Sequence, residues 1–330
     1  MFLPTGLLGR ASFGVRKPGL MILIEDLQNL KKPLRNVVLT IGNFDGVHRG
    51  HLALFGKVKE RAKAVRGKSA VMTFEPHPVR IMKPGNGPRL ITPTPQKLEL
   101  IDKAGIEVLF CLRFNKEFAA ISARDFVKAI LVDKIGIREL VVGYDYTFGH
   151  NREGNISLLR EMGDQMGFAV HLVGPVHVDR ALVSSTSIRM LIQEGRLDEA
   201  KVLLGRRYQL LGTVVKGHNR GGRLLGFPTA NLLVKDELLP KVGVYAVTVL
   251  IEGKTYDGVT NIGYNPTFQD QALSVETYIL DYSGELTGST IRINFVKRLR
   301  DEKKFPGVKE LVDQIDRDVE ETREVLAEVH

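Results

Sequence analysis

The sequence predicts two domains: an open, mostly parallel α/β sheet with helices on both faces, then a small antiparallel β-barrel with a terminal helix. Between about residues 36 and 175, short apolar runs alternate with helical patterns. From Tyr208 onward, alternating apolar and polar runs are separated by Gly, Pro, Asn and Asp, which is typical of antiparallel strands. The length of 330 residues also fits two domains, at roughly 150 residues each.

Charge divides the chain at a similar place. Residues 1–200 hold 29 Lys and Arg against 20 Asp and Glu, whereas residues 201–330 hold 18 of each kind. The net charge of +9 therefore lies in the first part, which is typical of a module that binds nucleic acid, a membrane surface or a polyphosphate such as ATP. The single cysteine, Cys111, excludes a disulfide scaffold and a cysteine-ligated zinc finger. The apolar runs are far too short to span a membrane.

Residues 1–20 are basic, without acids, and are set aside as a disordered leader or an extension. A helix is expected after Gly50, because its apolar residues repeat at helical spacing and its lysines and arginines fall on the opposite face. Another begins at Ser122 with a sequence that resembles a capping box. Two short helices are expected at about 185–194 and 197–204. The strands of the sheet are expected at 37–41, 70–74, 108–112, 140–142 and 169–173.

The barrel strands follow a linker at about 205–207. The last segment, 307–328, repeats apolar residues at helical spacing and is expected to be a helix that packs on the barrel. Its predicted apolar face consists of Val308, Leu311, Val312, Ile315, Val319 and Leu326. The barrel strands are expected at 208–215, 244–251, 274–280 and 290–296.

The first strand runs directly into a glycine-rich turn, residues 42–51, that carries two histidines, His48 and His51, before a helix. Glycines at 42, 46 and 50 let a ligand approach the backbone, and the N-terminus of a helix favours phosphate. Two imidazoles at such a place can donate hydrogen bonds to a triphosphate as negative charge builds during a displacement. Later in the chain, Ser185 and Thr186 are expected to open a second helix, with Arg189 reaching the same phosphate charge.

The second half has its own glycine-rich and basic segment, residues 212–231, which ends in Pro-Thr-Ala-Asn. Such a loop can close over phosphates. Thr229 and Asn231 provide hard oxygen donors that suit Mg²⁺. Glu276 lies on a predicted strand, where a partly buried carboxylate is costly unless it has a task. Two apparent motifs are set aside: Gly67-Lys-Ser69 lacks the P-loop glycine at position 62, and Asn155-Ile-Ser157 has no secretory signal.

Together these segments resemble the bacterial bifunctional riboflavin kinase/FAD synthetases, over about residues 35–330. The match to the adenylyltransferase module rests on residues 42–51, 73–78, 143–149 with Arg152 and Gly154, and 184–189. The match to the riboflavin kinase module rests on 212–231, 239–246, 261–268, 275–276 and 299–305. The resemblance is specific, because two unrelated sets of motifs occur in the order of the family.

The resemblance implies a Rossmann-like nucleotidyltransferase domain at 21–190, linker helices at 191–206 and a six-stranded riboflavin kinase barrel at 207–330. The barrel would transfer the γ-phosphoryl group of ATP to riboflavin, and the first domain would join the resulting FMN to AMP from a second ATP, giving FAD and pyrophosphate. Mg²⁺ is the expected cofactor. The expected partners are small molecules, without nucleic acid or membrane, for a cytoplasmic monomer or weak homo-oligomer.

The site residues are also expected from the resemblance. The catalytic residues would be His48, His51 and Glu276. ATP for adenylylation would contact Gly42, Phe44, Asp45, Gly46, Ser185, Thr186 and Arg189, and flavin or nucleotide would contact His77, Asp145 and Arg152. In the kinase, ATP would contact Gly222, Arg223, Gly226, Pro228, Thr229 and Asn231, with the metal on Thr229 and Asn231, and flavin on Arg300 and Phe305.

Two other functions stay open at the level of the residues. One is a nucleotidyltransferase with a different acceptor, or a fragment of an RNA-directed ligase, which the basic first half favours. A Lys-Met-Ser-Lys-Ser loop is absent from the sequence, and the second half would then be unexplained. The other is an inactive flavin carrier. The presence of the expected catalytic residues argues against that.

Overall fold

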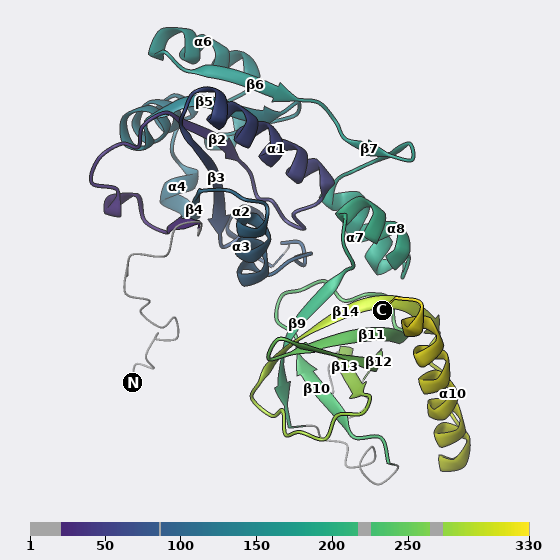
Figure 1. The fold of residues 1–330 in the computed structure, drawn as a ribbon. Coiled ribbons are helices and arrows are strands. Elements are labelled where there is room, and N and C mark those ends of the chain that lie inside the picture. Colours follow the sequence, from purple (N-terminus) through teal and green to yellow (C-terminus); the bar gives the residue numbers. More distant parts are fainter. Residues whose placement is uncertain (1–20, 86, 217–225, 265–272, 330) are drawn as a thin grey trace, which may run out of the picture.

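The computed structural model describes residues 21–329 except 86, 217–225 and 265–272, and its two domains are distinct in Figure 1. The first domain has a six-stranded sheet in the order β1-β4-β3-β2-β5-β6, and every neighbouring pair is parallel. Its strands are β1 (Ile22–Ile24), β2 (Val37–Ile41), β3 (Lys68–Glu75), β4 (Val108–Arg113), β5 (Ile137–Gly143) and β6 (Ala169–Val173).

Helices cover both faces of this sheet, as predicted. Successive residues of β2 alternate between two apolar cores: Leu39 packs with η2 and α6, whereas Val38 packs with α1 and α3. Burial on both faces explains why these strands read as continuous apolar runs. The helices and remaining short elements are η1 (Leu27–Asn29), α1 (Arg49–Ala64), α2 (Pro78–Met82), α3 (Thr94–Lys103), α4 (Lys116–Ala119), α5 (Ala123–Asp125), the π-helix η2 (Phe126–Ile135), η3 (His150–Arg152), α6 (Ile156–Met166), β7 (His177–Val178), β8 (Ala181–Leu182), α7 (Ser185–Gln193) and α8 (Leu197–Leu204).

The order of the strands reverses beside β2. From β2 the chain builds outward to β3 and β4, then crosses to the other side of β2 to form β5 and β6. Open α/β sheets bind ligands outside the carboxyl ends of the strands at such a switch point. The turn that carries His48 and His51 follows β2 and therefore lies at this point.

The second domain is a closed antiparallel barrel in the order β10-β13-β12-β11-β14-β9, followed by one long helix, as predicted. Alternate residues point into the barrel: on β13, Val275, Thr277 and Ile279 are buried, whereas the residues between them are half-buried. The elements are β9 (Gln209–Val215), β10 (Thr229–Leu233), β11 (Gly243–Ile251), β12 (Lys254–Tyr264), β13 (Leu273–Ile279), β14 (Thr290–Arg300) and α10 (Val308–Ala327).

The predicted apolar face of α10 needs one correction. Leu326 is fully buried, but Val308 is 63% exposed because it is the first residue of the helix and extends beyond the barrel surface. Two polar residues, Asp318 and Thr322, are buried instead. A similar end effect leaves Leu52, in the first turn of α1, 40% exposed.

The two domains share a contact surface (Figure 1). Helices α7 and α8 lie between the sheet and the barrel, and their apolar residues join the barrel core in one cluster with Tyr208 and Phe295. Leu90 pairs with the segment before β11: its N–H donates to the main-chain oxygen of Asp236 (2.9 Å), and its oxygen accepts from Leu238 (2.9 Å). Arg292 of β14 binds Glu99 of α3, with an Nη2–Oε2 distance of 2.5 Å.

Candidate active sites

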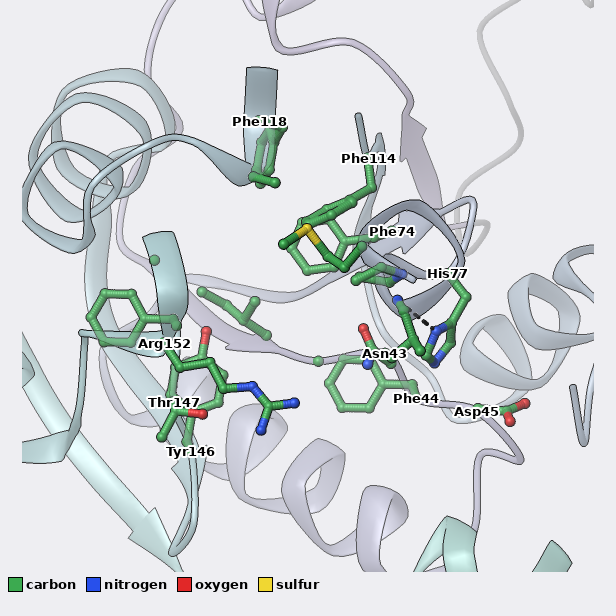
Figure 2. Close-up of a pocket in the computed structure, with 18 of the residues that line it drawn as sticks. Asn43, Phe44, Asp45, Phe74, His77, Phe114, Phe118, Tyr146, Thr147 and Arg152 are labelled. Carbon is green, nitrogen blue, oxygen red and sulfur yellow. Dashed lines mark hydrogen bonds between the residues drawn. The ribbon is translucent and has the colours of Figure 1, made fainter. Parts of the chain in front are cut away.

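A cavity of about 980 Å³ opens at the carboxyl ends of β2, β3 and β5 (Figure 2). Five separate segments of the chain contribute to its wall, which explains why no single motif defines it. Gly46, His48 and Thr186 do not line it directly. Of the residues predicted from the sequence, the cavity brings together Gly42, Phe44, Asp45, His51, His77, Asp145, Arg152, Ser185 and Arg189.

The turn after β2 has an unusual backbone. Phe44, Gly46 and Val47 have φ values of +49°, +91° and +40°. These values lie in the left-handed region, which residues other than glycine rarely adopt. A Cβ on Gly46 would also lie 3.3 Å from side-chain atoms of Ile91. The Phe44 ring is buried against His51, with ring centroids 5.2 Å apart. Strain of this kind persists where the surrounding structure holds it, and it is common at functional sites.

His48 and His51 form a reciprocal cap at the N-terminus of α1. His48 Nδ1 accepts from the N–H of His51 (3.3 Å), and His51 Nδ1 accepts from the N–H of His48 (3.4 Å). The two rings stack, with centroids 3.5 Å apart. Burial lowers the pKa of His48 to about 4 and holds the pKa of His51 well below its ordinary value. Both rings are therefore neutral at pH 7, and because each Nδ1 accepts, the proton resides on Nε2.

Asp45 is buried and fully engaged by the protein. Its carboxylate accepts from the N–H groups of Ile91 (3.0 Å) and Thr92 (3.1 Å), and it binds Nη2 of Arg189 at 2.6 Å. Its main-chain oxygen accepts from the hydroxyl of Ser185 (2.8 Å). Asp45 thus fixes Arg189 and the start of α7 against the turn that carries the histidines.

His77, at the end of β3, is also buried and lines the cavity. Its Nδ1 accepts from the N–H of Val79 (3.3 Å), so it caps α2. Burial lowers its pKa to about 4. Asp145 and Arg152 lie on the opposite side, after β5, and both are exposed at the cavity wall.

Sequence reasoning missed two features of this site. The first is Lys97 of α3, which is buried and donates from Nζ to Thr73 Oγ1 (3.2 Å) and to the main-chain oxygen of Asn43 (3.4 Å). Burial lowers its pKa. A lone lysine in a helical pattern gives no sequence signal, because most such lysines are exposed.

The second missed feature is an aromatic wall formed by Phe74, Phe114 and Phe118, with ring centroids 5.5–5.7 Å apart. Figure 2 shows these rings on one side of the cavity and Tyr146, Thr147 and Arg152 on another. The rings come from β3, α4 and the loop after β4, so only the fold brings them together. An apolar wall of this size suits a flat aromatic ligand.

A second cavity, of about 420 Å³, lies between the barrel and α10. Predicted residues Thr229, Glu276, Arg300 and Phe305 line it, and Asn231 is the strand partner of Glu276. Gly226, which has a φ of +87°, and Pro228 flank Phe227, which lines the cavity. Two predicted residues of this site, Gly222 and Arg223, lie outside the described residues.

Glu276 is half-buried on the outer face of β13. The barrel interior is filled by its neighbours, so the carboxylate faces the cavity rather than the core. Its partners on the adjacent strands are amides, Asn231 and Asn261, and within the described residues it has no ion pair. Burial and the charge of Glu302 raise its pKa. This geometry is typical of a carboxylate that is available for proton transfer. It is less typical of a carboxylate that belongs to a surface ion pair.

Arg300 is held by a residue that sequence reasoning missed. Its Nε and Nη2 donate to the carboxylate of Asp318 on α10, at 2.9 and 2.6 Å, and Asp318 is 3% exposed. Gln314 donates to the same carboxylate (2.9 Å). The guanidinium lies 5.8 Å from the centroid of Phe305. The sequence signal that could have identified Asp318 is the position of this acidic residue on the predicted apolar face of residues 307–328.

Two protein families match the two domains of the chain. The FAD synthetase family matches residues 30–187, and the riboflavin kinase family matches residues 204–326. The chain is 40% identical to the bifunctional riboflavin kinase/FMN adenylyltransferase of Listeria monocytogenes, covering 89% of this chain and 94% of that protein. It is 37% identical to the protein of the same name from Escherichia coli, covering 92% and 97%.

A solved structure is similar along nearly the whole chain. The crystal structure titled macrolide-efflux protein from Streptococcus pneumoniae has a TM-score of 0.82 and 33% identity, and the match covers 92% of this chain and 99% of that one. Among the described residues, no helix is long and apolar enough to cross a membrane. By the two family matches and by identity along almost the full length of its relatives, the chain belongs to the family of bifunctional riboflavin kinase/FMN adenylyltransferases.

Proposed function

We propose that each of the two reactions of the chain has its own cavity. The chain phosphorylates riboflavin to FMN and joins FMN to the adenylyl group of ATP, which gives FAD and pyrophosphate. The cavity at the ends of β2, β3 and β5 is the site of adenylylation, and the cavity between the barrel and α10 is the site of phosphorylation. The observation that carries the first assignment is the stacked, neutral pair His48 and His51 beside Arg189.

In adenylylation, an oxygen of the FMN phosphate attacks the α-phosphorus of ATP, a new P–O bond forms, and the bond to the β-phosphate breaks. Negative charge builds on the departing pyrophosphate. The Nε2–H donors of His48 and His51 and the guanidinium of Arg189 stabilise that charge. Ser185 and Thr186 add the N–H groups at the start of α7.

The other predicted residues of this cavity position the ligands. Gly42 and Gly46 are the proposed backbone contacts of the nucleotide. A Cβ on either would meet the side chain of Phe44 or Ile91, so both glycines are also needed to form the turn. Phe44 supports His51, and Asp45 orients Arg189. The aromatic wall holds a flat ring of the flavin or the nucleotide. His77, Asp145 and Arg152, at the edge of the cavity, contact flavin or nucleotide.

In phosphorylation, Glu276 acts as the general base. It takes the proton of the riboflavin 5′-hydroxyl as that oxygen attacks the γ-phosphorus of ATP and ADP leaves. The raised pKa of Glu276 strengthens it as a proton acceptor. Arg300 and Phe305 hold the flavin, and ATP contacts the loop at 222–231, including Gly226 and Pro228.

Mg²⁺ is the proposed metal of the kinase cavity, held by the side-chain oxygens of Thr229 and Asn231. Asn231 lies opposite Glu276 in the strand register, and Thr229 lines the same cavity as Glu276. Asn231 donates from Nδ2 to the main-chain oxygen of Thr229 (3.5 Å), which leaves its amide oxygen for a metal. No group of three His, Cys, Asp or Glu suited to a metal occurs in the part of the chain that the structure describes. That fits Mg²⁺, which often takes few protein ligands and several phosphate and water oxygens. The metal supplies charge neutralisation of the ATP phosphates.

We also propose that the substrates are small molecules and that nucleic acid is not a partner. On α1, Lys57 is paired with Glu60 (2.7 Å) and Arg61 with Glu139 (2.7 Å), so part of its positive charge is neutralised internally. Two basic residues without an ion pair among the described residues, Lys83 and Arg152, line the first cavity instead. A cytoplasmic monomer or weak homo-oligomer is the state we propose.

One experiment tests both assignments. The purified chain is incubated with riboflavin, ATP and MgCl₂, and the flavins are separated by chromatography. We expect FMN to form first and FAD second. When FMN is supplied in place of riboflavin, we expect FAD to form directly. Formation of FMN without FAD would contradict the assignment of the first cavity. The absence of both products would support a flavin carrier, and an adenylylated product other than FAD would support a different acceptor.

A further inference from the structure

Arg206 lies in the segment between α8 and β9, outside every motif recognised in the sequence. Its side chain is half-buried, and Nη1 donates to the main-chain oxygen of Val47 (3.3 Å), the residue before His48. Its Nε is buried and has no hydrogen-bond partner among the described residues. A residue of the interdomain segment therefore reaches the turn that carries the two histidines.

Arg206 and its neighbour Arg207 are the two half-buried arginines of the described residues without a carboxylate partner. Arg206 differs from Arg207 because it reaches the main-chain oxygen of Val47 and because its Nε is buried without a hydrogen-bond partner. Six other half-buried arginines each bind a carboxylate within 3.0 Å. Arg206 has no such partner in the described part of the chain. A desolvated guanidinium without a carboxylate is costly, and that cost falls when an anion binds nearby. The six paired arginines are Arg61, Arg80, Arg189, Arg292, Arg298 and Arg300.

The surroundings of Arg206 are rich in positive charge. After burial, the charge of Arg206 contributes to the lowered pKa values of both His48 and His51. Arg189 acts on His48 and Lys97 acts on His51 in the same direction. Asp45 is the carboxylate that acts on His48, and it is already bound to Arg189. Three cations thus act on the histidines. Asp45 is bound to Arg189 and Glu75 acts on Lys97, whereas Arg206 has no carboxylate bound to it among the described residues, so an anion would complete the charge balance at Arg206.

We propose that Arg206 is a positioning residue for adenylyl transfer. It fixes the turn at Val47 from the interdomain segment and adds its charge to the end of the cavity that receives the triphosphate. This inference rests on the proposed assignment of adenylylation to the first cavity. It implies that the segment joining the domains is part of the adenylylation site as well as a connection.

The test compares Arg206→Met with Arg206→Lys in the full-length chain. Methionine keeps much of the length and removes the charge, whereas lysine keeps the charge. Arg207→Met is the matched control: Arg207 is the next residue, is also half-buried, and has no ion pair or hydrogen bond among the described residues. Riboflavin phosphorylation by each variant reports whether the barrel is folded, and inhibition of FAD formation by adenosine reports whether the first cavity is intact.

Three quantities are measured: kcat/KM for FAD formation from FMN and ATP, inhibition by inorganic tripolyphosphate, and inhibition by adenosine. We expect Arg206→Met to lower kcat/KM and to weaken tripolyphosphate inhibition by about tenfold or more, the usual effect of losing a charged donor. Adenosine inhibition and kinase activity should stay within about twofold, since neither involves the triphosphate end of this cavity. Arg206→Lys should recover most of the loss, and Arg207→Met should match the unmodified chain.

Normal FAD formation and tripolyphosphate inhibition in Arg206→Met would overturn the inference while leaving the proposed function intact. Equal losses in Arg206→Met and Arg206→Lys, or equal weakening of adenosine and tripolyphosphate inhibition, would also overturn it, because those results indicate a packing role. An unmodified chain that makes FMN but no FAD would refute the proposed function of the cavity, and the inference with it.

Discussion

At the scale of single residues, the protonation state of His48 and His51 determines what they can do. A neutral imidazole whose Nδ1 accepts a backbone hydrogen bond can only donate from Nε2. In the proposed reaction, both rings would therefore act as neutral hydrogen-bond donors to phosphate at pH 7. General-base action is unnecessary here, because the attacking phosphate of FMN is already an anion. Burial favours the neutral form of both rings. Because of the same burial, protonation of the rings in acid destabilises the folded chain.

We predict that His51→Ala abolishes most FAD formation and leaves FMN formation nearly unchanged. Loss of one donor to the developing charge typically costs about 2.7–4 kcal/mol in the transition state, or about a hundredfold or more in rate. The rates of both reactions are measured on the same preparation. His177→Ala, an exposed histidine on β7, is the control. Equal loss of both activities would point to misfolding or to a shared site.

We predict that acid destabilises the chain partly through His48. Its pKa of about 4 in the folded chain lies below the ordinary value of 6.5, so between these values the unfolded chain binds more protons. The free energy of unfolding therefore falls as the pH falls from about 6.5 toward 4, by about 2 kcal/mol between pH 7 and 5 for this residue. Urea unfolding of His48→Gln should show a correspondingly smaller loss. An unchanged pH dependence would contradict the neutral state of His48.

We predict that Glu276→Gln lowers kcat for FMN formation by at least about a hundredfold, because a general base is usually worth about 10²–10⁴-fold. Glutamine keeps the shape of the side chain and removes its basicity. Adenylylation of supplied FMN should not change, and Glu252→Gln, in an exposed turn, should affect neither reaction. A normal kcat for FMN formation in Glu276→Gln would contradict this role. The general base would then be sought among the residues of 217–231.

At the scale of elements, the success of sequence reasoning depended on burial. Strands β2 and β6 both match their predicted bounds. β2 is buried throughout and reads as an unbroken apolar run, whereas β6 is a partly exposed edge strand whose apolar residues still form a short run. Five of the described strands were missed, and two of them, β7 and β8, have only two residues each. β1 has only three residues, and β10 and β12 carry many half-buried polar or small residues, so none has a strong pattern.

The candidate sites show the same limit. Motif residues such as His51 and Glu276 were found because they lie in recognisable local sequence. Lys97 and Arg206 were not, since each belongs to a site only through contacts with residues 24 and 159 positions away. The aromatic wall was missed for the same reason. The roles of all these residues remain predictions, whereas the two-domain fold is confirmed.

The terminal helix α10 carries a prediction of its own. Because Asp318 holds Arg300 at the kinase cavity, Asp318→Asn should raise the KM for riboflavin by about tenfold, as expected for a weakened charged hydrogen bond. The kcat should change less, since the base is elsewhere. The control is Glu321→Gln, also on α10, which weakens an exposed ion pair with Lys297 of β14. A rise in KM for both variants would indicate general loosening of α10.

At the scale of the whole molecule, the boundary between the domains is a shared structure. Helix α7 presents Ser185 and Arg189 to the adenylylation cavity and packs Ile188 and Leu191 into the barrel cluster. Leu90 pairs with the segment before β11, while the neighbouring Ile91 binds Asp45. The domain boundary at residue 190 therefore stays a proposal about function. In the structure, helix α7 spans residue 190 and packs against both domains.

The last prediction concerns fragments of the chain. We expect residues 206–330 to phosphorylate riboflavin and to make no FAD, because all the kinase segments, with Glu276 among them, are retained and the adenylylation cavity is lost. The fragment should nevertheless melt at least about 10 °C below a fragment of residues 184–330. Removal of α7 and α8 uncovers core positions of the barrel, and each buried leucine is worth about 1.5–3 kcal/mol.

Thermal unfolding and kinase assays of both fragments, with the full chain as reference, check this. A control fragment of residues 184–330 in which Leu203 and Leu204 are replaced by alanine should melt between the other two, because those side chains are 4% and 1% exposed. Equal melting temperatures for 184–330 and 206–330 would mean that α7 and α8 do not stabilise the barrel. A folded 206–330 fragment without kinase activity would mean that the phosphorylation site also depends on the first domain. The contact between Arg292 and Glu99 would then be the first place to examine, since it joins a barrel strand to α3.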